Sequence, residues 1–122
     1  MKPRIDETEF GSITIEGTVF DHDVIIRPDG HVKKRKKKLS KAIYGTSHTI
    51  SLQEAEYVWG QGAKPERLIV GSGQYGNVDL SPEASAYLEQ KGCSVELLST
   101  PEVINVWNRT KGRTIGLFHV TC

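Results

Sequence analysis

The fold is decided by the stretch LIVGSGQYGNVDLSPEASAYLEQKGCSVELLSTPEV, residues 68–103. An apolar strand at 67–70 precedes Ser81-Pro82-Glu83, which signals a helix start. Serine caps helices, proline suits the first helical position, and an acid favours the first turn. A strand at 94–98 and a second start signal, Thr100-Pro101-Glu102, follow. Alternating strands and helices predict crossover connections and largely parallel pairing.

The flanking segments extend this pattern in both directions. The second helix ends near Gly112 and a final strand is predicted at 114–120. Upstream, Ser51-Leu52-Gln53-Glu54 is a capping box, in which Glu54 reaches back to the start of a short helix that ends near Gly60. The strand segments 68–70 and 95–98 are mostly continuous apolar runs, which is typical of strands covered on both faces.

The first part of the chain has β-strand patterning. A hairpin is predicted around Glu16-Gly17, and Val24-Ile25-Ile26 is followed by the turn Pro28-Asp29-Gly30. We therefore expect a β-rich hairpin region over residues 1–45 and an alternating helix and strand region over 46–122. Together they form a single α/β domain over residues 1–122, in which the antiparallel half extends the later sheet or packs beside it.

Composition excludes several classes of protein. The chain has 122 residues, the size of one domain, and a formal net charge of +1, so no strong field steers it to nucleic acid or membranes. No apolar run has the length of a membrane span. Two cysteines, Cys93 and Cys122, are predicted to be free thiols, which together with an acid-containing N-terminus indicates a cytoplasmic protein.

The segment Gly71-Ser72-Gly73-Gln74-Tyr75-Gly76 matches the dinucleotide-binding pattern directly after a strand. The next helix starts only near Ser81, so a tight turn with packing glycines is favoured. A looser hypothesis is a small cleft for an anion at the edge where strand ends and helix starts meet. Its predicted residues are Gly71, Ser72, Gly73, Gln74, Gly76 and Thr100.

A basic run follows the strand near Val32. It consists of Lys33, Lys34, Arg35, Lys36, Lys37 and Lys38. Lysines often protect the exposed edge of a sheet, so a solvated edge is favoured. One alternative is a patch that binds a protein partner or an acidic substrate. The other is a nucleic-acid contact, although the run contains no aromatic residue on which bases could stack.

No set of residues marks a reaction or a metal site. The four histidines are His22, His31, His48 and His119, and they lack the close-spaced partners that zinc sites use. His119 and Cys122 would point to opposite faces of a continuous strand, so we expect no thiol–imidazole pair. The sequence therefore predicts no catalytic residue, no metal ligand and no cofactor.

Several motifs together resemble one known family. They are Phe10-Gly11-Ser12-Ile13, Val24-Ile25-Ile26 with Asp29-Gly30, Leu68-Ile69-Val70-Gly71-Ser72-Gly73, Val106-Trp107-Asn108, Gly112-Arg113 and Gly116-Leu117-Phe118-His119-Val120-Thr121-Cys122. The chain resembles the adipogenesis-associated domain family, a small α/β family of unknown function whose members include a mitochondrial complex I assembly factor. The resemblance implies three layers around a central mixed sheet, and no catalytic residues.

The family resemblance favours a non-catalytic interaction or assembly module with a protein partner. One alternative is a domain that binds a small anionic ligand, or an enzyme, using the glycine-rich loop 71–76. The other is a nucleic-acid-associated protein using the basic run 33–38. The pattern does not specify an oligomeric state.

Overall fold

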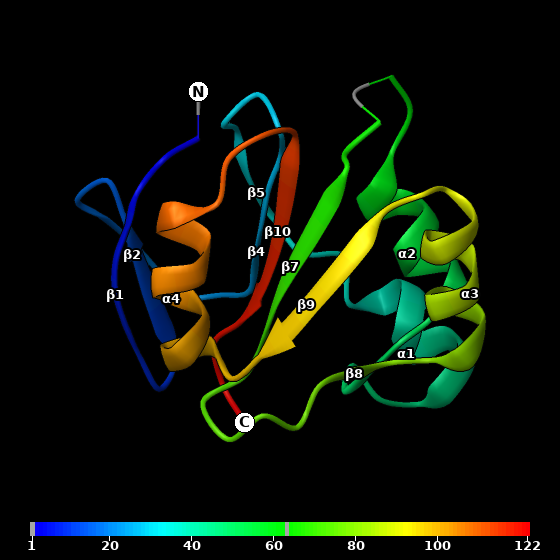
Figure 1. The fold of residues 1–122 in the computed structure, drawn as a ribbon. Helices are drawn as coiled ribbons and strands as arrows, with labels where there is room; N and C mark the ends of the chain where they lie inside the picture. Colours follow the sequence, from blue (N-terminus) through cyan, green and yellow to red (C-terminus); the bar gives the residue numbers. More distant parts are fainter. Residues whose placement is uncertain (1, 63) are drawn as a thin grey trace.

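The structure, a computed structural model, describes residues 2–62 and 64–122 and is built on a five-stranded central sheet (Figure 1). The strand order is β5-β4-β10-β7-β9. The strands are β4 (Val24–Ile26), β5 (Val32–Lys34), β7 (Arg67–Ser72), β9 (Ser94–Leu98) and β10 (Thr114–His119). β10 pairs in parallel with β7 and antiparallel with β4, and β7 pairs in parallel with β9. The predicted mixed sheet is therefore confirmed.

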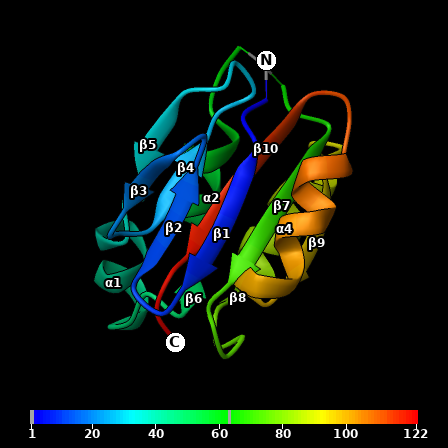
Figure 2. The same cartoon turned by 90° about the vertical axis from the view of Figure 1, so that its left-hand side faces the viewer.

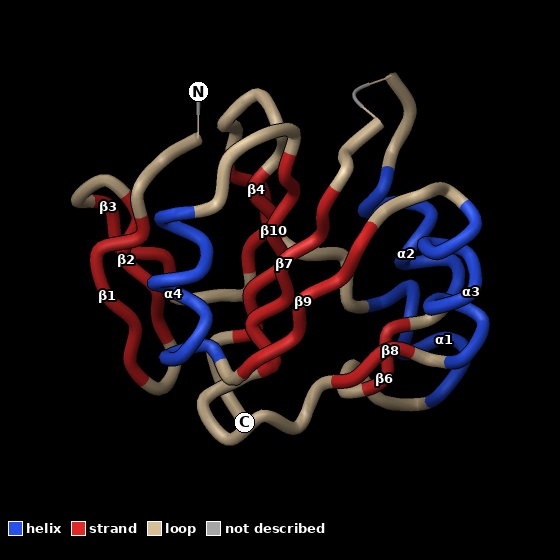
Figure 3. Tube along the Cα trace, in the orientation of Figure 1, coloured by secondary structure: helices blue, strands red, loops and turns tan. Residues whose placement is uncertain are grey.

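Two layers cover this sheet. On one face lie the three-stranded antiparallel sheet and helix α4, and on the other face lie α1, α2 and α3 (Figures 1 and 2). The covering elements are β1 (Ile5–Glu9), β2 (Ser12–Ile15), β3 (Thr18–Phe20), α4 (Thr100–Arg109), α1 (Lys38–Tyr44), α2 (Leu52–Trp59) and α3 (Pro82–Gln90). A short parallel pair, β6 (Thr49–Ile50) and β8 (Asp79–Leu80), lies beside the α1–α3 layer (Figure 3).

The central strands are buried on both faces and so divide the interior into two cores. In β7, Leu68 and Val70 face the core shared with α2 and α3, whereas Ile69 faces the core shared with α4 and the small sheet. This follows from the two-residue period of a strand. Each core thus contains side chains from the central strands and from one of the two helices that have a proline in the first turn, α3 in one core and α4 in the other.

Gly116 in β10 shows how closely the α4 side is packed. A Cβ atom at this position would lie 2.5 Å from the Phe118 ring and 2.8 Å from the Trp107 ring. The two rings are both fully buried and meet edge to face at 5.5 Å. Glycine is therefore required at this position by close approach rather than by an unusual backbone angle.

The N-terminal half realises both predicted arrangements. β4 and β5 extend the central sheet, whereas β1–β3 form a separate sheet that packs on it. β9 differs from the prediction of a strand covered on both faces: Ser94, Val95 and Glu96 are exposed because β9 is an edge strand.

Helix α1 was not predicted. It begins within the basic run and has no side-chain hydrogen bond at its N-cap, Lys37, so the sequence offers no start signal there. Within residues 2–62 and 64–122, no helix combines the length and apolarity needed to cross a bilayer.

Candidate functional site

The carboxyl ends of β7 and β10 meet at one edge of the sheet, where the chain's last residues lie against the glycine-rich loop. The Gln74 amide donates to the Thr121 carbonyl at 2.7 Å, and the Asn77 amide donates to the Cys122 carbonyl at 3.2 Å. Gly73 has a φ of +105°, and a Cβ there would lie 2.6 Å from the Cys122 carbonyl oxygen. The loop and the C-terminal segment are thus packed together.

The predicted ligand residues of this edge are brought together, but by contacts within the chain. Gly71 and Ser72 belong to β7 rather than to a loop. The Gly73 amide donates to Thr100 Oγ1 at 2.9 Å, and Thr100 Oγ1 donates to the His119 carbonyl at 2.6 Å. The Gly76 amide donates to the Gly73 carbonyl. The amides of Gly73 and Gly76 thus already have partners within the chain, and the anion cleft stays a prediction.

The basic run divides into two kinds of residue. Arg35 is buried, with its side chain fully enclosed, whereas its neighbours face outward. We call the outward-facing set the lysine surface; it comprises Lys33, Lys34, Lys36, Lys37 and Lys38. All are exposed except Lys37, which is half-buried. Arg35, which the sequence groups with a solvated basic run, is instead buried, because its guanidinium has carboxylate partners in the interior.

Those partners are Glu54 and Asp23. Arg35 Nε donates to Glu54 Oε2 at 2.6 Å and Nη2 donates to Oε1 at 3.0 Å, which is the two-pronged geometry that guanidinium and carboxylate favour. Arg35 Nη1 donates to Asp23 Oδ2 at 3.0 Å. Arg35 Nη2 also donates to the Ser47 carbonyl at 2.8 Å.

Glu54 departs from its predicted role in the capping box. Ser51 does cap α2, since its Oγ accepts from the Glu54 amide at 3.1 Å. The Glu54 carboxylate, however, bonds to Arg35 and accepts from Ser40 Oγ at 2.5 Å. A sequence motif identifies the helix start, but the buried guanidinium is the stronger partner for the carboxylate.

Asp23 connects this network to the last strand. Its Oδ2 lies 2.7 Å from His119 Nδ1, and its Oδ1 accepts from the Val120 amide at 2.9 Å. Burial alone would raise the pKa of Asp23, but the hydrogen bonds from His119 and Val120 and the charges of His119 and Arg35 lower it to about 2. Asp23 is therefore an ionised carboxylate in the interior.

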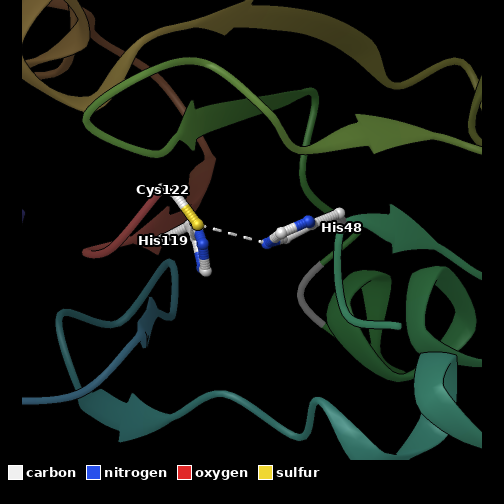
Figure 4. A group of neighbouring side chains, drawn as sticks. All are labelled: His48, His119 and Cys122. Atoms are coloured by element: carbon white, nitrogen blue, oxygen red, sulfur yellow. Dashed lines mark hydrogen bonds between the residues drawn. The ribbon is translucent and has the colours of Figure 1, made fainter. Parts of the chain in front are cut away.

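His119 belongs to a second cluster, shown in Figure 4. His48, from the segment before β6, places Nε2 3.7 Å from Cys122 Sγ. One nitrogen of each imidazole and the thiol sulfur all lie within 4.8 Å of one another. The rings of His48 and His119 meet edge to face at 5.6 Å.

Sequence reasoning missed this cluster. His48 is 71 residues from His119, so no local spacing reveals it. The expectation that His119 and Cys122 point apart assumed a continuous strand, whereas β10 ends at His119 and the remaining residues turn toward the glycine-rich loop. The other thiol, Cys93, is buried in the α2–α3 core, and burial raises its pKa to about 11.

Comparisons with known proteins show which family and which folds the chain is similar to. A family model described as "Protein of unknown function (DUF498/DUF598)" matches residues 5–118. The conserved hypothetical protein PH1505 from Pyrococcus horikoshii OT3 is 35% identical, covers 98% of this chain and 99% of its own, and superposes with a TM-score of 0.89. The protein MT938 is 30% identical over 99% of this chain and 100% of its own, with a TM-score of 0.83.

A more distant structure shares the fold alone. A Bordetella pertussis protein described as a Mth938-like domain is 21% identical over 97% of this chain and 85% of its own, with a TM-score of 0.61. The motif resemblance is thus confirmed as far as a domain family of unknown function. The matching model does not carry the adipogenesis-associated name that the motifs suggested.

Proposed function

Because the protein belongs to the DUF498/DUF598 family, whose function is unknown, we propose a role from its own surface: it is a non-catalytic binding module that docks an acidic protein segment on the lysine surface. The observation that carries this proposal is the inward turn of Arg35. A guanidinium held by two buried carboxylates fixes the segment between β5 and α1, and the flanking lysines are thereby displayed from a rigid support.

The lysine surface is short of internal counter-charges. Among the described residues, only Lys37 of this set has a carboxylate within 4.0 Å, namely Asp23 at 3.9 Å. The segment 34–38 also lines an open hollow of about 490 Å³. Positive charge is concentrated here although the whole chain carries only +1. Such a surface complements an acidic partner.

Edge protection accounts for only part of this charge. Lys33 and Lys34 lie on β5, an edge strand, where lysines discourage pairing with another sheet. Lys36 and Lys38 lie beyond the strand, so that explanation does not cover them. Their exposure supports a docking role in addition.

The contacts of Tyr57, an aromatic residue beside the lysine surface, favour an acidic protein segment over single-stranded nucleic acid as the partner. Single-stranded nucleic acid is held partly by base stacking on aromatic side chains. Tyr57 lies beside the lysine surface, but Lys36 Nζ is 4.6 Å from its ring centre and Arg27 is 5.3 Å away. The ring is therefore already engaged by two cations of the chain.

The test uses a fluorescent poly-glutamate peptide and two variants that each remove three charges. K33Q/K34Q/K38Q alters the lysine surface and leaves Lys36 on Tyr57, whereas K64Q/K91Q/K111Q alters exposed lysines elsewhere. Three exposed ion pairs at about 0.5 kcal/mol each correspond to about tenfold weaker binding for the first variant. The control triple should change affinity less than about twofold.

Two results would count against the proposal. Equal losses in both triples would mean that the protein responds only to total charge. Tighter binding to duplex DNA than to poly-glutamate, again lost in K33Q/K34Q/K38Q, would replace the acidic protein segment by nucleic acid as the partner.

A further inference from the structure

Three side chains that are distant in sequence converge at the C-terminal edge of the sheet, and each offers an atom that binds transition metals. They are His48, His119 and Cys122, with their ligand atoms within 4.8 Å of one another (Figure 4). We propose that these residues form a binding site for a divalent transition-metal ion of the zinc class, with three protein ligands and one open position.

The distance between the ligand atoms of His48 and Cys122 fits such an ion. Zinc lies about 2.3 Å from cysteine sulfur and about 2.0–2.1 Å from histidine nitrogen in a tetrahedral site. The corresponding nitrogen–sulfur edge of the tetrahedron is about 3.6 Å. His48 Nε2 lies 3.7 Å from Cys122 Sγ. The pair is therefore spaced for a shared ion with little movement.

The tautomer of His119 is set by a buried carboxylate. Asp23 Oδ2 lies 2.7 Å from Nδ1, so this nitrogen carries the proton and Nε2 keeps the lone pair that a metal needs. Asp23 is itself fixed by Arg35 Nη1 and by the Val120 amide. A carboxylate that orients a histidine in this way is the usual support of a metal-bound imidazole.

The hydroxyl group of Thr121 must move when a metal ion binds. Thr121 Oγ1 lies 3.2 Å from His119 Nε2, and its hydroxyl donates to the lone pair of that nitrogen. Thr121 is half-buried on the terminal segment, beyond the end of β10, so its hydroxyl can turn away. Alternatively, it remains near the open position as an oxygen donor.

The charge of the neighbourhood also favours a cation. When His119 is neutral, as a metal ligand must be, Asp23 and Glu54 carry two negative charges against the single positive charge of Arg35, and all three of these side chains are buried. Lys37 Nζ, 3.9 Å from Asp23, is half-exposed and offsets this only in part. A divalent ion bound to a thiolate and two neutral imidazoles adds one positive charge and balances the excess.

The three ligand atoms indicate the class of metal. They also argue against the simpler explanation of a cysteine–histidine pair that acts as a nucleophile. Calcium and magnesium prefer oxygen ligands, whereas a thiolate with two imidazoles suits zinc and its neighbours. A thiol activated as a nucleophile would need only His48 as its base. A nucleophilic thiol would not require the second imidazole, His119, which is oriented by the buried carboxylate of Asp23.

The test is titration of the chelator-treated full chain with cobalt(II), a spectroscopic substitute for zinc. We expect visible bands of a four-coordinate ion and a near-ultraviolet thiolate-to-cobalt band, both abolished by equimolar zinc. Cys122→Ser should remove the thiolate band, and His48→Ala should weaken binding at least about tenfold. Cys93→Ser and His22→Ala are the matched controls and should leave the spectrum unchanged.

Asp23→Asn separates positioning from ligation. With its circular dichroism spectrum unchanged, this variant should keep the thiolate band but bind cobalt about 10–100-fold more weakly. Bands that persist in Cys122→Ser and His48→Ala, or a weak six-coordinate spectrum without a thiolate band in the parent chain, would overturn the proposal. Binding to poly-glutamate is measured separately, so a failure here leaves the docking proposal standing.

Discussion

Replacing Arg35 by methionine tests the buried charge network most severely. The Arg35 side chain makes four hydrogen bonds of 2.6–3.0 Å, and removing it deprives Glu54 of its buried cation and Asp23 of one of its cationic partners. Breaking a buried ion pair from one side costs about 3–5 kcal/mol. We expect Arg35→Met to lower the free energy of unfolding by that amount.

The assay is urea unfolding at neutral pH, followed by tryptophan fluorescence. With an m-value of about 1.5–2 kcal/mol/M, the expected loss moves the midpoint down by about 2–3 M. Lys34→Met is the matched control: it removes a charge from an exposed neighbour and should change stability by less than about 0.5 kcal/mol.

A second variant distinguishes lost packing from unpaired charge. In Arg35→Met/Glu54→Gln, one of the two stranded carboxylates is replaced by a neutral amide, so the double variant should be more stable than Arg35→Met alone. A loss below about 1 kcal/mol in Arg35→Met, or no recovery in the double variant, would refute the reasoning.

Three further predictions concern other parts of the fold. The lowered pKa of Asp23 contributes stability that is complete above its unfolded value of 3.8 and is lost as pH falls toward about 2, so acid titration of Asp23→Asn should show a flatter decline in this window than the parent chain. Gly116→Ala should cost about 1–3 kcal/mol, because its Cβ meets two buried rings, and unchanged thermal stability would contradict that packing. Cys93, whose pKa burial raises to about 11, should resist iodoacetamide at pH 8, and mass spectrometry should find the half-buried Cys122 modified first.

The sequence predicts the fold where local chemistry and global packing agree. Ser81 accepts from the Ala84 amide as a helix cap should, and β7 carries the apolar run of a strand covered on both faces. The same logic fails at α1, where lysines at the start of a helix give no signal. It also fails at β9, where an apolar pattern belongs to an edge strand.

The candidate site was beyond sequence reasoning because its contacts are long-range. Arg35 looks like any other member of a basic run until Asp23 and Glu54 are folded against it. His48 and Cys122 meet only because the terminal segment turns after His119. Residue spacing carries no information about such contacts, whereas the glycines that follow the apolar run of β7 are visible in the sequence, although Gly71 and Ser72 are still part of that strand.

Arg35 is locked in the interior by two carboxylates, and it thereby supports both the lysine surface and, through Asp23, the imidazole of His119. The most direct measurement is NMR of the arginine side chains in 15N-labelled protein. We predict that one guanidinium, assigned to Arg35 by its loss in Arg35→Met, shows separate Nη–H signals and an Nε–H protected from solvent exchange. A single averaged Nη signal for Arg35, exchanging with water as fast as those of exposed arginines, would contradict the account.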